Sequence, residues 1–63
     1  MTKEQINELR AKDLKKKANR IAYLQELIEE EDWHGIQDVA SDIREIVERL
    51  LMYSYLEADN GGP

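Results

Sequence analysis

The short segment from Glu31 to Gly35 separates two long stretches of helix-like sequence, and this break constrains the fold more than any other feature. Before it, apolar residues recur at spacings of mostly three and four, and no Gly or Pro occurs until residue 35. Such spacing is typical of an amphipathic helix. The positions are Ile6, Leu9, Leu14, Ala18, Ile21, Leu24, Leu27 and Ile28. We therefore expect an all-α fold, an antiparallel helical hairpin.

The ends of both helices are marked by capping residues. Thr2 followed by Gln5 matches a capping box, which predicts a first helix over residues 3–30. A bend or break near residues 11–13 is the alternative, because the apolar step there is five and Asp13 could cap a fresh start. Asp32 can accept free amide hydrogens, so the turn is predicted at 31–32 and the second helix at 33–57. The single domain covers residues 1–58, and the Asn-Gly-Gly-Pro end predicts a flexible tail over 59–63.

The second helix has an apolar stripe too wide for one neighbour. Ile36, Ile43 and Leu50 repeat every seven residues, and further apolar residues follow each of them. Two helices that share one seam leave much of this stripe exposed, so we expect a dimer forming a four-helix bundle, or a higher oligomer. The C-terminal turn is apolar all the way round, which favours a subunit or partner interface. The expected interface residues are Ile36, Ile43, Ile46, Leu50, Leu51, Met52, Tyr53, Tyr55 and Leu56.

Composition narrows the classes of function. The 63 residues contain no Cys and one His, which excludes a disulfide framework and gives no reason to expect a cofactor. No apolar run reaches membrane-spanning length and no signal-peptide core occurs, so the expected location is the cytoplasm. Net charge is −5, with seven Lys/Arg and three Asp/Glu in residues 1–20 against two and eleven in residues 21–63. An acidic total disfavours general nucleic-acid binding.

A basic face on the first helix is the first candidate ligand site. Cations beside an aromatic ring could hold a phosphate and stack a base. The alternative is a solvated face that pairs with Asp42, Glu45 and Glu48 across the hairpin. The candidate residues are Lys12, Lys16, Asn19, Arg20 and Tyr23.

The turn itself supplies a second candidate site. Trp33 and His34, with Arg44 or Arg49 of a neighbouring chain, could form a small site, although Trp33 is expected to pack against the end of the first helix. Gly35 suggests that something approaches the backbone closely. Glu31-x-x-His34 has metal-like spacing, but it lies at the turn and further ligands are missing, so no metal is expected. No Cys nucleophile and no Gly-rich phosphate loop occur, and we predict a protein that is not an enzyme.

Resemblances to two groups of known proteins suggest a biological role. The Met1-Thr2-Lys3 start, the hairpin plan and the acidic, Gly-containing tail resemble the Rop family of plasmid copy-number regulators, which are dimeric four-helix bundles that bind RNA. This resemblance implies an RNA-binding regulator that uses the basic face of the first helix, but no RNA-binding residue is carried over. Residues 27–46 resemble small helical proteins of phages and prophages, which often sequester or block a host component. We expect a non-enzymatic protein that binds and inhibits or sequesters a host protein or a small anionic or nucleotide ligand.

Overall fold

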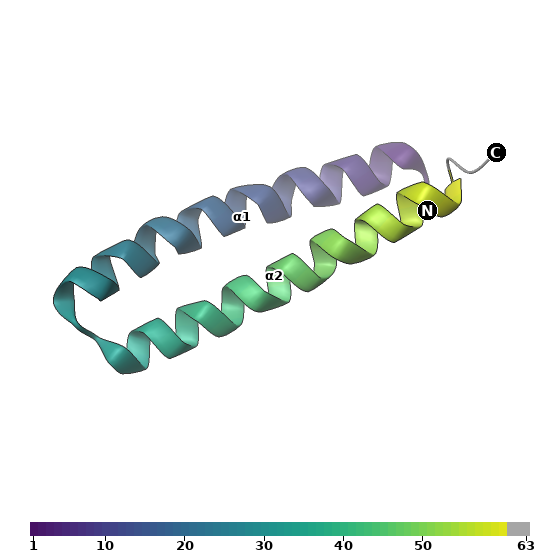
Figure 1. Cartoon of the computed structure of the whole chain (residues 1–63). Helices are drawn as coiled ribbons and strands as arrows, with labels where there is room; N and C mark the ends of the chain where they lie inside the picture. The colour runs from purple at the N-terminus through teal and green to yellow at the C-terminus, as the bar shows by residue number, and fades with distance from the viewer. Residues whose placement is uncertain (61–63) are drawn as a thin grey trace.

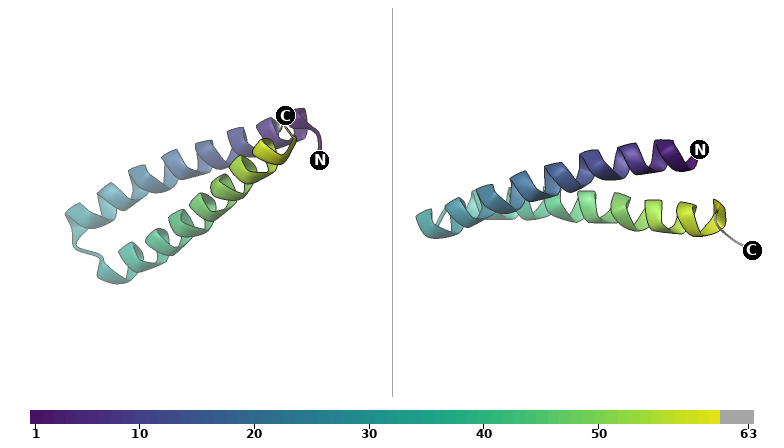
Figure 2. Two further views of the ribbon diagram at one scale, coloured as in Figure 1. Left: turned by 45° about the vertical axis from the view of Figure 1, so that its right-hand side comes forward. Right: turned by 90° about the horizontal axis from the view of Figure 1, so that it is seen from above.

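The computed structural model describes residues 1–60, which form a hairpin of two long antiparallel helices (Figure 1). Helix α1 spans Lys3–Glu30 and helix α2 spans Trp33–Asn60. Two further views show the start of α1 and the end of α2 side by side, opposite the turn (Figure 2). The predicted all-α hairpin is confirmed. Helix α1 is unbroken, and α2 continues three residues beyond the predicted end at 57; residues 61–63 of the predicted tail lie outside the described residues.

Both predicted helix starts are confirmed by their hydrogen bonds. Thr2 Oγ1 accepts a bond from the Gln5 amide at 3.2 Å, and Gln5 Oε1 accepts one from the Thr2 amide at 2.9 Å. At the turn, Asp32 Oδ1 accepts a bond from the Gly35 amide at 3.1 Å. Between the helices, Glu31 adopts a left-handed conformation with φ of 57°, and its amide donates to the Ile28 carbonyl. These bonds satisfy backbone groups that helix ends otherwise leave free.

Gly35 is where the two helices approach most closely at the turn. A Cβ atom at this position would lie 3.0 Å from Cδ2 of Leu27 and 2.8 Å from Oδ2 of Asp32. The predicted close approach is therefore confirmed. The predicted packing of Trp33 on the end of α1 is wrong, since Trp33 is 66% exposed.

The seam between the helices is built from residues seven apart in each helix. The buried residues are Ile6, Asp13 and Leu27 in α1 and Val39, Ile46 and Tyr53 in α2. Arg20 occupies the remaining seven-residue step of α1. The seam is therefore apolar near both ends and charged in its middle. Asp13, which the sequence suggested could cap a new helix, is instead 4% exposed inside the seam.

Two residues predicted at an oligomer interface lie inside one hairpin instead. Ile46 and Tyr53 are each 4% exposed, so neither side chain is available to another molecule. Both belong to the seven-residue series that starts at Val39, and this series is the side of α2 that packs on α1. The prediction is corrected for these two residues.

Candidate functional site

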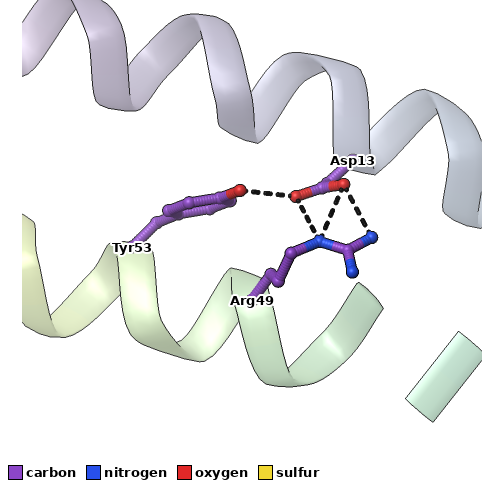
Figure 3. Close-up of polar contacts among 3 residues, drawn as sticks. All are labelled: Asp13, Arg49 and Tyr53. Carbon is purple, nitrogen blue, oxygen red and sulfur yellow. Dashed lines mark hydrogen bonds and ion pairs between the residues drawn. The ribbon is translucent and has the colours of Figure 1, made fainter. Parts of the chain in front are cut away.

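A buried carboxylate organises the middle of the seam (Figure 3). Tyr53 Oη donates a hydrogen bond to Asp13 Oδ2 at 2.7 Å. Arg49 Nη2 donates to Asp13 Oδ1 at 3.1 Å, and Arg49 Nε lies 3.2 and 3.3 Å from the two carboxylate oxygens. A phenol and a guanidinium from α2 thus satisfy one carboxylate from α1. A buried charge is tolerated when it is paired and hydrogen-bonded in this way.

The network shifts the ionisation of two of its members in opposite directions. Hydrogen bonding from Arg49 lowers the pKa of Asp13 below its usual 3.8, against a smaller opposing effect of burial. The Tyr53 hydroxyl donates a hydrogen bond to the Asp13 carboxylate, which raises the pKa of Tyr53 above its usual 10.0. At neutral pH the pair is therefore a carboxylate and a neutral phenol. Neither group has the ionisation of a general base poised near pH 7.

A groove of about 500 Å³ opens beside this network on one side of the seam. Its volume is within the range of small-molecule sites. Ile46 lies at its base, and charged or polar side chains form most of the rest. The lining residues are Lys16, Asn19, Arg20, Tyr23, Asp42, Glu45, Ile46 and Arg49.

The structure brings together four of the five residues predicted on the basic face of the first helix. Lys16, Asn19, Arg20 and Tyr23 line the groove, whereas Lys12 does not. The opposite wall comes from α2, and its Asp42 carboxylate lies 3.7 Å from Arg20 Nε. The predicted pairing of this face with Asp42 is thereby confirmed. With Glu45 also in the wall, three cations and two carboxylates line the groove, a formal charge of +1.

The second predicted site does not form within one chain. Trp33 and His34 are exposed at the turn, and Arg44 pairs with Glu48 one helical turn further along α2, at 3.4 Å. Arg44 and Glu48 are both largely exposed, as is common for such pairs. Arg49, which was considered only as a contact from a neighbouring chain, belongs to the seam of its own chain. The signal that could have found it is Asp13, a carboxylate that lies seven residues after Ile6 and fourteen before Leu27.

The side of the hairpin opposite the groove is apolar. In α1, the seam positions 13, 20 and 27 are each followed directly by a large aliphatic residue. These residues are Leu14, Ile21 and Ile28, and they are 43%, 40% and 52% exposed. Adjacent residues in a helix point about 100° apart, so these three lie to one side of the seam, away from Lys16 and Tyr23. Val47 follows the seam residue of α2 in the same way and is 40% exposed.

This side is named here the apolar face. It comprises the residues after the seam positions together with their neighbours on the same side of each helix. Its members are Leu14, Ala18, Ile21, Leu24, Gln25 and Ile28 in α1 and Ile36, Ala40, Ile43, Val47, Leu50, Leu51 and Ser54 in α2. These members are uncharged, but Lys17 shares the seven-residue position of Leu24 and Arg44 shares that of Leu51. The Arg10–Glu57 ion pair continues the same side away from the turn. Of the predicted interface residues, Ile36, Ile43, Leu50 and Leu51 belong to this face.

Three more predicted interface residues lie elsewhere on α2. Met52 and Tyr55 are 48% and 70% exposed, and Leu56 is half-buried. Tyr55 lies two residues after the buried Tyr53, so it points away from α1. Tyr55 follows Leu51 by one helical turn, so it adjoins the outer edge of the apolar face.

Within residues 1–60, no helix is long and apolar enough to cross a membrane. No cluster of three or more potential metal ligands occurs in the same part of the chain. Comparison of the chain with protein-family models, with curated proteins and with solved structures found no match.

Proposed function

We propose that this chain is a non-enzymatic interaction protein that pairs with a second copy to form a four-helix bundle and binds a partner, which it inhibits or sequesters. The main support for this proposal is the apolar face. It exposes large aliphatic side chains along both helices of a chain rich in charged residues. Contiguous exposed apolar surface of this kind marks an interaction site. The resemblance to phage proteins gives the proposal its setting, an accessory or anti-defence role in the cytoplasm of a host cell.

The dimensions of the apolar face suit a second copy. The hairpin measures 49 by 15 Å, so one face offers roughly 700 Å², close to the ~800 Å² that each partner contributes to a stable interface. One seam between two helices buries only five apolar residues among those described. A small domain with so limited a core is usually supported by oligomerisation, disulfides or metals, and the chain has no Cys.

The partner contact is assigned to the outer surface of α2 near its C-terminal end. Tyr55 and Met52 are exposed there and remain uncovered when the apolar face is buried. Tyr and Met are enriched at protein interfaces. The neighbouring Glu45 and Glu48 make the surface acidic, which favours a protein partner with an apolar pocket and a basic rim.

A Rop-like RNA-binding role is the second candidate. Lys12, Lys15 and Lys16 are exposed, and none of them forms an ion pair with another of residues 1–60. Lys16 lies with Tyr23 in the groove, and Lys12 and Lys15 are close to it along α1, which favours an anionic ligand, either RNA or a small phosphate compound. Asp42 and Glu45 in the facing wall repel phosphate, and for this reason RNA is placed second.

Sedimentation equilibrium tests the assembly. We expect a dimer at roughly 10 μM protein, a concentration at which many specific associations are populated. Ile21→Asp combined with Val47→Asp places two charges on the apolar face and should yield a monomer. The matched control, Ala22→Asp combined with Ser41→Asp, adds the same charge at exposed positions off this face and should remain dimeric. Circular dichroism verifies that both variants stay helical; a helical wild-type monomer contradicts the proposal.

The partner contact and the RNA alternative are separated by two further variants. Tyr55→Asp should leave the dimer intact and abolish inhibition of the partner. Lys12→Glu combined with Lys16→Glu should leave that inhibition intact. Saturable binding of an RNA hairpin that weakens steeply between 50 and 200 mM salt, and that the lysine variant loses, would favour the second candidate instead.

A further inference from the structure

The charges of the hairpin are separated along its long axis. Residues 21–43 form the half that contains the turn and hold seven Asp/Glu with no Lys or Arg, a charge of −7. Residues 1–20 and 44–60 form the half opposite the turn. They hold nine Lys/Arg and seven Asp/Glu, a charge of +2. The Arg20–Asp42 pair lies at the boundary between the halves.

We infer that the second copy lies antiparallel on the apolar face, so that the turn half of each hairpin lies beside the terminal half of the other. The inference rests on the proposed function, because it concerns the same face. Two hairpins can meet through this face with two-fold symmetry in two ways. An axis along the helices places both turns at one end, and an axis across the helices places them at opposite ends.

Charge decides between the two arrangements. With both turns at one end, the two turn halves bring −14 together, twice the −7 of one copy. With turns at opposite ends, each end holds −7 and +2, a sum of −5. Copies packed face to face keep many of these charges within the roughly 10 Å over which salt leaves them effective. The antiparallel arrangement therefore avoids the larger repulsion.

The stacking of the helices follows from the same symmetry. An axis across the helices lays α1 on α1 of the second copy and α2 on α2. Within α1, residues 3–20 hold seven Lys/Arg and three Asp/Glu, and residues 21–30 hold three Glu and no cation. Antiparallel stacking brings the basic first part of each α1 beside the acidic last part of the other. An axis along the helices would instead lay α1 on α2, with both acidic ends adjacent.

Because the chain contains no Cys, single cysteines labelled with pyrene can report the orientation through excimer emission. Ala11 and Gln25 lie on the same side of α1, and both are exposed. In the antiparallel dimer, position 25 of one copy lies near position 11 of the other. Mixing Ala11→Cys with Gln25→Cys should give a several-fold rise in excimer emission. Gln25→Cys alone should give none, because two such labels are separated by about 14 residues, or roughly 21 Å.

The parallel arrangement has its own signature. It places position 25 of α1 beside Ala40 of α2 in the second copy, so a mixture of Gln25→Cys with Ala40→Cys would give the excimer. Emission in that mixture, and not in the first, overturns the orientation and leaves the proposed dimer standing. Sedimentation of the labelled proteins is measured alongside, and a monomer overturns the proposed function together with the orientation.

Discussion

The two sides of the seam differ in how their side chains are satisfied. On the groove side, Asp13 is bonded by Arg49 and Tyr53, and Arg20 pairs with Asp42. On the apolar face, the next residue along the chain is Leu14, which is 43% exposed. One step of about 100° around the helix separates a carboxylate that the hairpin completes by itself from a leucine that it leaves open. The comparison teaches that the hairpin satisfies its buried carboxylate internally, whereas it leaves large aliphatic side chains exposed on the other side.

The largest expected effect on stability comes from removing the buried carboxylate of Asp13. Asp13→Ala leaves the buried Tyr53 hydroxyl without its acceptor, and we expect the free energy of unfolding to fall by about 2–3 kcal/mol. Urea denaturation at one fixed protein concentration measures it. Asp38→Ala is the matched control, since Asp38 is exposed and forms no hydrogen bond or ion pair through its side chain with any other of residues 1–60. Equal losses in the two variants would contradict the role of the network.

Leu14→Ala tests the neighbouring residue on the other side. The side chain is already partly exposed in the hairpin, so truncation should have little effect on its helicity. Burial of the leucine against a second copy should contribute about 1–2 kcal/mol, which predicts a dimer dissociation constant raised roughly tenfold. Sedimentation equilibrium measures this constant. A large loss of helicity with an unchanged dimer dissociation constant would indicate that Leu14 stabilises the single hairpin and not the dimer.

Acid should weaken the groove side selectively. The folded-state pKa of Asp13 lies below the usual 3.8, so its contribution to stability is present above that value and is lost as pH falls through the lower folded-state pKa. Thermal unfolding followed from pH 7 downward should show this loss. In Asp13→Asn the melting temperature should start lower and change less over the same range. Identical pH profiles would exclude Asp13 as the source.

Arg20→Gln should have the smallest effect. The Arg20 and Asp42 side chains are each 48% exposed, and exposed ion pairs contribute only about 0.2–1 kcal/mol. Urea denaturation at low and high salt should show a small loss that salt removes. A loss as large as that of Asp13→Ala would place Arg20 in the same buried network.

Much of the hairpin could be predicted from local sequence. The Thr2–Gln5 capping box, the Asp32 cap and the close approach at Gly35 depend on residues a few positions apart, so their consequences are confirmed in the structure. Trp33 was wrongly expected to pack, because its surroundings depend on where α2 meets Leu27. Tyr53 was wrongly assigned to an outer interface, since a stripe of apolar residues does not indicate which members face the partner helix.

The candidate site was predicted only in part. Lys16, Asn19, Arg20 and Tyr23 share one side of α1 by periodicity alone, so their grouping follows from the sequence. Arg49 and Asp13 lie 36 positions apart, and their contact requires the register between two helices. Periodicity within each helix carries no information about that register.

The sequence by itself determined two long amphipathic helices, where each begins, where the chain turns, and the uneven placement of charge along it. These properties depend on backbone hydrogen bonds and on residues within one or two helical turns. Only the tertiary structure decided that Asp13 lies in the seam with Arg49 and Tyr53, that the groove has an acidic wall, and that one side remains apolar. The reason is physical: burial and pairing depend on which side of each helix faces the other, and that choice is made by the packing of the whole hairpin.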